Sequence, residues 1–197
     1  MRKFGLWLVV GLLAFASGSA LAQKRVNIRG TVTAFDGNVV TVASREGGQV
    51  QVALPEKVRV SGTKTITLAE IKPGTPLGVT TVKRADGKIV AIDVRPIPPT
   101  APKGLSAYDL QPGSTMTNAV LEGQVQANDG SELTLDYKSG TVKVLVPPGT
   151  PMSRAIPGKR ADIEPGKTIY IAARAGADGK LTALRVQVST GGVKPTQ

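Results

Sequence analysis

The chain has 197 residues, neither cysteine nor histidine, only 4% aromatic residues and a formal net charge of +11. The missing residue types exclude disulfides, thiol nucleophiles, an imidazole base at neutral pH, and nearly all zinc, copper and haem sites. Most hydrolase and redox mechanisms are excluded with them, and the fold must be stabilised by burial of apolar surface.

Residues 1–22 are typical of a signal peptide. Two basic residues precede an apolar run at 4–16, and a small-residue motif ends at Ala22. The run is shorter than the roughly 20 residues that a helix needs to cross a bilayer. We therefore expect cleavage near Ala22-Gln23 and a mature chain with no transmembrane span, located in the periplasm or secreted.

The mature chain contains an internal repeat. ADGK at 85–88 recurs as ADGK at 177–180, which is 92 positions later, and IKPG at 71–74 recurs as IEPG at the same spacing. Such a repeat predicts two homologous structural units, at residues 23–96 and 119–190.

Each unit is expected to contain five strands and one helical turn. In the first unit, β-branched runs separated by turn residues predict strands at 29–35, 39–45 and 49–55. TLAE at 67–70 has the spacing of a capping box and is stopped by Pro-Gly, which predicts a single helical turn. A fourth strand near 76–83, an Asp-Gly turn and a fifth strand follow.

The fifth strand shows the alternation of a strand with one buried face. Val90, Ile92 and Val94 are predicted to face the core, whereas Ala91, Asp93 and Arg95 are predicted to face solvent.

The predicted order of elements defines a fold class. Five strands with a helical turn between the third and fourth are typical of an OB-type barrel, so the sequence predicts an all-β protein with two tandem five-stranded OB-like small barrels. A pair of open antiparallel sheets, or one sandwich of about ten strands, remains open, and so does a strand shared between units.

The remaining segments are a connector and a tail. Residues 97–118 begin Pro-rich and are expected to form a semi-rigid connector. Four apolar side chains in this region predict that it packs on one or both barrels: Leu105, Tyr108, Leu110 and Met116. Residues 191–197 are expected to be disordered.

Two segments carry a resemblance to a known family. PGSTMTNA at 112–119 and ADGKLTALRV at 177–186 resemble a family of exported bacterial proteins of unknown function, built from small OB-like β domains. The resemblance covers most of the mature chain. It implies export and tandem small barrels, and it brings no established activity.

Local strings that resemble catalytic motifs lack the required context. Ser61 and Lys64 have S-x-x-K spacing without partner motifs, and GKT at 166–168 precedes a strand instead of a helix. Most carboxylates are expected in turns, as at Asp36 and Asp86, and no Asp-Gly turn has the ligand run of a calcium loop. We expect no catalytic residues, no cofactor and no metal, and therefore no enzyme.

The distribution of charge supplies the site hypothesis. Residues 24–96 contain twelve basic and six acidic residues, against nine and seven in residues 119–190. One interpretation is a solvated surface with no binding role. The functional interpretation is an anion-facing or partner-facing surface near the helical turn of each unit, formed by Lys57, Arg59, Lys64, Lys83, Arg84, Arg154, Lys159 and Arg160.

The sequence favours a non-catalytic exported module of the cell envelope that binds an envelope protein or an anionic envelope polymer. One alternative is a structural or assembly component that acts through strand edges and the connector. Binding of single-stranded nucleic acid ranks lowest, because the mature chain has only four aromatic residues on which bases could stack.

Overall fold

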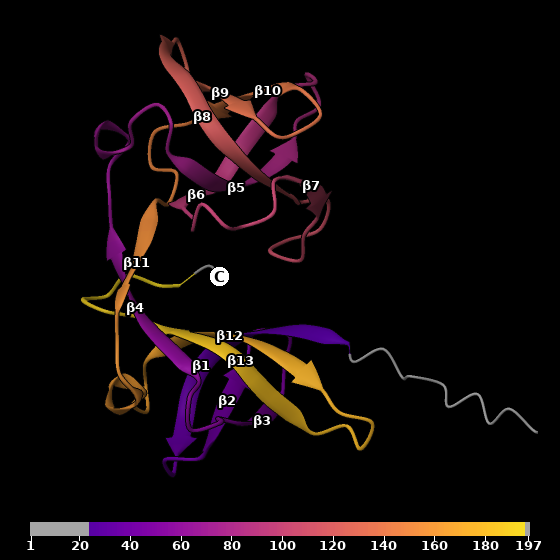
Figure 1. Ribbon diagram of the computed structural model, residues 1–197, viewed down its shortest axis with the longest axis vertical. Helices are drawn as coiled ribbons and strands as arrows, with labels where there is room; N and C mark the ends of the chain where they lie inside the picture. The colour runs from indigo at the N-terminus through magenta and orange to yellow at the C-terminus, as the bar shows by residue number, and fades with distance from the viewer. Residues whose placement is uncertain (1–23, 196–197) are drawn as a thin grey trace, which may run out of the picture.

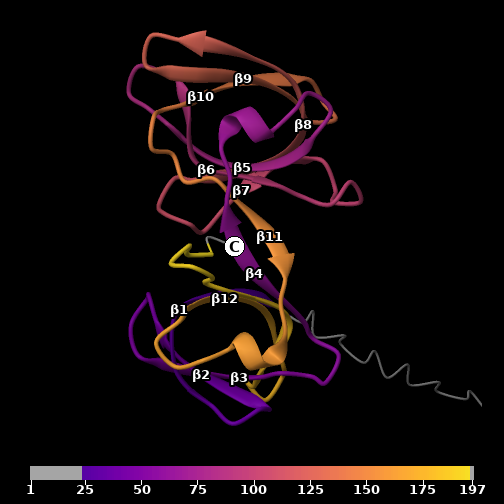
Figure 2. The same cartoon turned by 90° about the vertical axis from the view of Figure 1, so that its left-hand side faces the viewer.

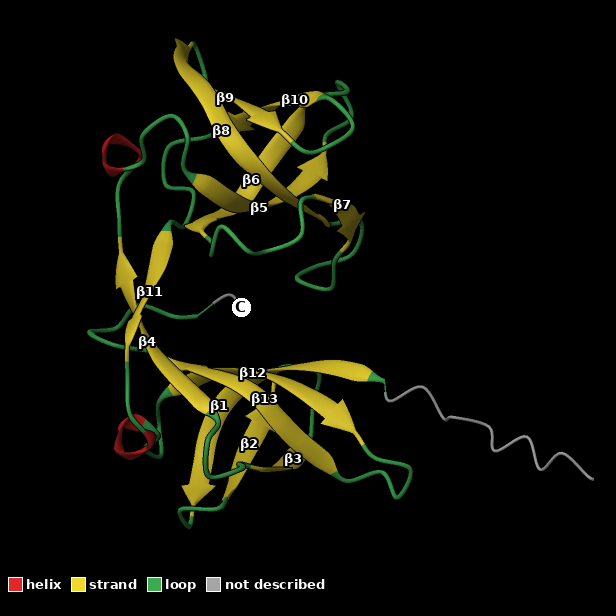
Figure 3. Cartoon of the chain, viewed as in Figure 1, coloured by secondary structure: helices red, strands yellow, loops and turns green. Residues whose placement is uncertain are grey.

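The computed structural model describes residues 24–195 and contains two β-barrels, one above the other in Figure 1. Figure 3 shows that these residues form mainly strands, and within residues 24–195 the helical structure is limited to two short turns. The prediction of an all-β protein with two five-stranded OB-like barrels is confirmed. The predicted signal peptide and residues 196–197 lie outside the described residues.

The lower barrel in Figure 1, barrel A, has a core of Val, Ile, Leu and Ala side chains. It consists of β1 (Arg25–Phe35), β2 (Val39–Ser44), β3 (Gln49–Ala53), β12 (Thr168–Ala175) and β13 (Leu181–Val188). The strand order is β13-β12-β1-β2-β3, and a parallel pairing between β13 and β3 closes the barrel. Closure removes the exposed edges that an open sheet would present.

The upper barrel, barrel B, has the same plan. It consists of β5 (Pro76–Lys83), β6 (Ile89–Pro96), β8 (Thr115–Ala127), β9 (Gly130–Asp136) and β10 (Thr141–Val146). The order is β5-β6-β10-β9-β8, and pairing between β5 and β8 closes the barrel. The short strand β7 (Gly104–Ala107) adds to β8 on its outer side.

Each barrel combines strands from both sequence repeats. Barrel A takes β1–β3 from the first repeat and β12–β13 from the second, and barrel B takes the remaining strands of each. The predicted units 23–96 and 119–190 are therefore not the physical barrels. The reason is that both repeats have the same hydrophobic pattern, so strands 1–3 of one copy can close with strands 4–5 of either copy.

Two further strands, which the sequence did not predict, carry the chain between the barrels. β4 (Arg59–Thr65) and β11 (Ser153–Pro157) pair antiparallel along the left side of Figure 1. Val60 at the start of β4 packs in the core of barrel A, whereas Ile66, just after β4, packs in the core of barrel B. The β4–β11 ribbon is therefore where the repeats exchange partners.

A short 3-10 turn packs at each barrel, as Figure 2 shows. The turn η1 (Leu68–Glu70) has the predicted capping box, in which the Thr67 backbone N–H donates to Glu70 Oε1 at 2.8 Å. The residue after η1, Ile71, is buried in barrel B. The turn η2 (Arg160–Asp162) is followed by Ile163, which is buried in barrel A.

Arg160 holds η2 against the end of β3. Its Nη1 donates to the Gly37 carbonyl at 2.6 Å and its Nη2 to the Pro55 carbonyl at 2.5 Å, with longer contacts to the Leu54 carbonyl. Hydrogen bonds from a charged donor contribute about 1.5–3 kcal/mol each when their acceptors are partly buried. Arg160 is thus a structural clamp within barrel A.

Replacing Arg160 by alanine is expected to lower the free energy of unfolding by about 2 kcal/mol, because the backbone carbonyls of Gly37, Leu54, Pro55 and Glu56 lose a charged donor. Urea unfolding of the protein measures this loss. Lys159→Ala is the matched control, since the Lys159 side chain is exposed and the bond to Asp162 uses its backbone N–H. Equal midpoints for the two variants would contradict the clamp.

The connector packs on the barrels in part, and its last four residues already belong to a strand. β8 begins at Thr115, inside the predicted connector, and Met116 is buried. Tyr108 is half-buried, whereas Leu105 is 51% exposed and does not pack as expected. The boundary expected between residues 118 and 119 is therefore replaced by a strand that runs through it.

Residues 191–195 have defined contacts instead of the expected disorder. Val193 forms a β-bridge with Thr190, and its carbonyl accepts a hydrogen bond from Thr63 Oγ1 at 2.5 Å. Pro195 is buried. The end of the described chain consequently lies in the space between the two barrels (Figure 1).

Candidate functional site

The candidate site is a pocket of about 140 Å³ between the two barrels, which we call the inter-barrel pocket. Barrel A and the β4–β11 ribbon contribute Arg59, Ser61, Thr63, Ser153, Ala155, Arg185 and Gln187, and barrel B contributes Arg95, Pro96, Ile97 and Pro98. Three arginines and no carboxylate are among these lining residues. The pocket is therefore electropositive.

Strand register explains why the arginines converge. β13 pairs parallel with β4, so Arg185 lies beside Arg59 and Gln187 lies beside Ser61. Alternate residues of a strand point to opposite faces, and Val186 between them is buried in the barrel A core. Arg185 and Arg59 consequently face outward, toward barrel B.

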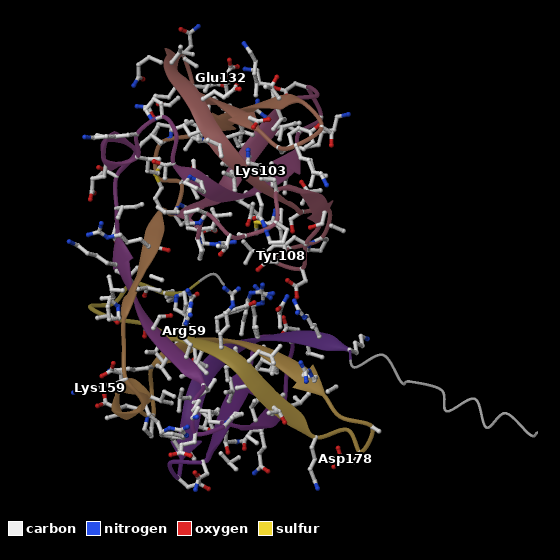
Figure 4. The ribbon with its side chains drawn as sticks, in the orientation of Figure 1. Arg59, Lys103, Tyr108, Glu132, Lys159 and Asp178 are labelled. Atoms are coloured by element: carbon white, nitrogen blue, oxygen red, sulfur yellow. The ribbon has the colours of Figure 1, made fainter. Side chains whose placement is uncertain are left out.

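The same outer face continues across β12 and β1. Register places Tyr170 opposite Arg29, and Arg174 opposite Arg25. We call the five arginines of this surface the arginine face: Arg25, Arg29, Arg59, Arg174 and Arg185. Figure 4 shows side-chain nitrogens gathered between the barrels, with the labelled Arg59 below them and Tyr108 above.

Tyr170 is the centre of the arginine face. Its ring is 2% exposed, and the guanidinium carbons of Arg29 and Arg185 lie 5.1 and 5.4 Å from the ring centroid. Its hydroxyl donates to Asn27 Oδ1 at 2.8 Å. Cation–π contacts of this kind stabilise desolvated guanidinium groups, so the ring holds two like charges close together.

A carboxylate from the connector already binds one end of the arginine face. Asp109 accepts hydrogen bonds from Arg29 Nη2 at 2.9 Å and from Asn27 Nδ2 at 3.0 Å. Desolvation acts to raise the pKa of Asp109, but these hydrogen bonds outweigh it and hold the pKa below its usual value. Arg29 also donates to the Tyr108 hydroxyl at 2.9 Å. The face is thus chemically suited to bind oxyanions.

Asp93 and Arg95 contradict the predicted pattern of the fifth strand. Both were expected to face solvent, yet Asp93 is fully buried and Arg95 is only 7% exposed. The apolar core of barrel B takes Val94, and it also takes Ala91, which was predicted to face solvent as well. Asp93 lies beside Met152 and Val193, whereas Arg95 lines the inter-barrel pocket. A register shift opposite Thr80 and Thr81 also breaks the simple alternation, and Ile92 is only partly buried.

The two residues form a buried ion pair in which Arg95 Nη1 donates to Asp93 Oδ2. Burial lowers the pKa of the Arg95 guanidinium, the Asp93 carboxylate opposes that shift, and Arg185 adds to it. The Nε of Arg95 has no hydrogen-bond acceptor among residues 24–195. An anion between Arg95 and Arg185 would stabilise both charges.

The structure brings only one of the eight predicted site residues into the inter-barrel pocket, namely Arg59. Lys57 is exposed just before β4. Lys64 and Arg154 are partners in the β4–β11 ribbon, on the face opposite the pocket. The pKa of Glu70 is lowered mainly by its hydrogen bonds with Thr67, and the charges of Arg154 and Lys64 lower it further. None of these three residues therefore lines the inter-barrel pocket with Arg59.

The other four predicted residues lie elsewhere. Lys83 and Arg84 are at the β5–β6 hairpin of barrel B, where Arg84 pairs with Asp86 at 2.8 Å. Arg160 is the structural clamp, and Lys159 precedes it at the outer side of barrel A, as labelled in Figure 4. The predicted set is therefore spread over several surfaces.

Sequence reasoning did not select five of the six arginines of this site, namely Arg25, Arg29, Arg95, Arg174 and Arg185. Arg95 and Arg185 are 90 positions apart, and they meet only because each repeat gives its last strand to a different barrel. The sequence offered one signal, which was that Arg185 lies at a polar position of an alternating strand pattern. The strands β6 and β13 share this pattern.

Comparisons with family models, with curated proteins and with solved structures return no match. Among residues 24–195 no helix is long and apolar enough to span a membrane. The same part of the chain contains no group of three or more acidic side chains placed to bind a metal ion. The geometry of the arginine face is thus the basis for a functional assignment.

Proposed function

We propose that this protein is a non-catalytic exported module that binds an anionic polymer of the cell envelope through the arginine face. The observation that supports it is the convergence of Arg59, Arg95 and Arg185 on one pocket between the barrels. Guanidinium groups are the preferred protein ligands of carboxylates and phosphates, because they donate in a planar fork.

Repulsion between the arginines of this site opposes folding, and a site that is retained despite this repulsion supports a role in binding. Six arginines, the five of the arginine face and Arg95, lie on the surfaces that face the gap, against two carboxylates, Asp93 and Asp109. Like charges at such separations repel one another, and desolvation increases the repulsion. A bound polyanion would offset this repulsion, and it would release counterions as it binds.

An extended ligand fits the arginine face better than a single small anion. Arg25 and Arg174 lie on β1 and β12, whereas Arg59 and Arg185 lie on β4 and β13, so the charges run across four neighbouring strands. Asp109 at Arg29 shows how a single carboxylate is held there. A polymer with repeated carboxylate or phosphate groups would satisfy several of these arginines together.

The test is binding of the mature chain to polyphosphate and to polygalacturonate at a series of salt concentrations. Replacing both Arg59 and Arg185 by glutamine is expected to weaken binding about tenfold at low salt. It should also reduce the slope of log K against log salt by about 1 to 2, because two phosphate or carboxylate contacts are lost.

Lys83→Gln with Arg84→Gln is the matched control, since it removes the same charge from the exposed β5–β6 hairpin. This control should leave affinity and slope close to those of the unmodified chain. Equal loss of affinity in both double variants would show that only net charge matters. Salt-insensitive capture of a protein partner would instead support the assembly role that acts through strand edges and the connector.

A further inference from the structure

The inter-barrel pocket differs from the rest of the arginine face because one of its arginines is almost completely buried. Arg95 is 7% exposed, and its three nitrogens have unequal partners. Nη1 donates to Asp93, Nη2 lies 3.4 Å from the Met116 sulfur, which is a weak acceptor, and Nε has no acceptor within the described chain. A buried donor without an acceptor is rare and costs about 1–3 kcal/mol.

The pocket surrounds this arginine with donors from several directions. Arg59 and Arg185 approach from β4 and β13, and Ser153 approaches from β11. Ser61 and Thr63 use their hydroxyl protons on the carbonyls of Val186 and Val193, at 3.2 and 2.5 Å. The guanidinium groups, Ser153 and the Gln187 amide are the groups that can donate to a ligand.

The repeats explain why these donors surround one point. Ser61 and Ser153 are 92 positions apart, and so are Arg95 and Gln187, which is the spacing of the internal repeat. Equivalent residues of the two repeats therefore line the same pocket: Ser61 and Ser153 come from the two strands of the β4–β11 ribbon, and Arg95 and Gln187 come from opposite barrels. The pocket lies where the two copies meet, and the polar groups of both point to it.

This arrangement favours a tetrahedral anion over a planar one. A carboxylate has two oxygens in one plane and matches a single guanidinium fork. A phosphoryl group has three or more terminal oxygens in different directions, so it can accept from several guanidinium groups at once. The volume of about 140 Å³ is several times the ~30 Å³ share of one water, which is room for one phosphoryl group.

We propose that the inter-barrel pocket binds one phosphoryl group of a phosphate-bearing polymer, held by Arg95, Arg59 and Arg185. The proposal rests on the proposed function, which it narrows from anionic polymers in general to phosphate-bearing ones. Arg95 supplies the buried charge, and the two exposed arginines close over the ligand from barrel A.

The test follows the Arg95 Nε–Hε resonance of the mature protein by NMR during titration with inorganic phosphate, tripolyphosphate and acetate. We expect both phosphate ligands to shift this resonance, tripolyphosphate to bind more tightly, and acetate to leave it unchanged at equal concentration. Arg185→Gln, an exposed variant that should fold, is expected to weaken tripolyphosphate binding about tenfold. Lys83→Gln is the charge-matched control.

The outcomes separate this proposal from the broader one. An equal shift with acetate, or polyphosphate binding that leaves the Arg95 resonance unchanged, overturns the phosphoryl pocket while polymer binding to the arginine face stands. A shift with inorganic phosphate alone overturns the polymer as the source of the phosphoryl group. Failure of both polyphosphate and polygalacturonate to bind overturns the proposed function together with the pocket.

Discussion

Replacing Gly30 by alanine is expected to lower the free energy of unfolding by about 3 kcal/mol, as overpacking against rigid neighbours does at its upper end. A Cβ at this position would lie 2.0 Å from the Ala43 carbonyl oxygen and 2.7 Å from a Val42 methyl group. Gly30 pairs with both β12 and β2, so the strained contact involves backbone that two strands hold in place. Thermal unfolding of the protein measures the effect.

The internal repeat supplies the matched control for Gly30. The repeat aligns Gly30 with Gly123, 93 positions later, yet a Cβ at Gly123 meets nothing within 4 Å. Gly123→Ala should therefore leave stability unchanged or raise it by about 0.5 kcal/mol, since glycine is unfavourable within a strand. Similar losses in the two variants would contradict the close approach of β1 and β2 in barrel A.

Replacing Asp93 by asparagine is expected to lower the free energy of unfolding by about 3–5 kcal/mol, because it leaves the buried Arg95 charge without its counter-charge. Asp93 is fully buried, and Arg95 has no comparable carboxylate partner among its described contacts. In a chain of this size the loss corresponds to a fall in Tm on the order of 10 °C. Differential scanning calorimetry measures it.

A second variant separates the charge effect from simple loss of packing. Arg95→Met in addition to Asp93→Asn should restore most of the stability, because no unpaired charge remains between the barrels. Glu122→Gln, the same change at an exposed position of β8, should have no effect. If the Asp93→Asn variant has the same Tm as the unmodified chain, the ion pair does not neutralise Arg95.

The strands of each barrel could be predicted because their pattern is local. Turn residues and alternating β-branched residues set β2, β3 and β5 close to where the structure has them. The exchange between repeats could not be predicted, since β3 and β10 offer equivalent edges to the final strand of either copy. The β4–β11 ribbon decides the pairing, and its residues, including Gly62 and Pro157, lack a clear strand pattern.

The sequence predicted that the site is positively charged, but it did not predict where the site lies in the fold. Arg59 was identified because it belongs to a basic run, but the same criterion selected Arg160, whose guanidinium donates to four backbone carbonyls of barrel A. Arg95 and Asp93 were assigned to the solvent face of β6 by alternation. They are buried because distant parts of the chain pack beside them: Asp93 lies near Met152 and Val193, and Arg95 shares the inter-barrel pocket with Arg59 and Arg185. No feature of the local sequence reports these contacts.

The most direct test of binding at the arginine face is arginine footprinting of the protein with phenylglyoxal, with and without saturating polyphosphate, read by mass spectrometry. We predict that the polymer protects Arg59, Arg174 and Arg185, while Arg84 and Arg154 react as they do in the free protein. All five side chains are exposed, so each can be labelled in the absence of ligand. Protection of Arg84 and Arg154 to the same extent, or no protection of Arg59 and Arg185, would contradict binding at the arginine face.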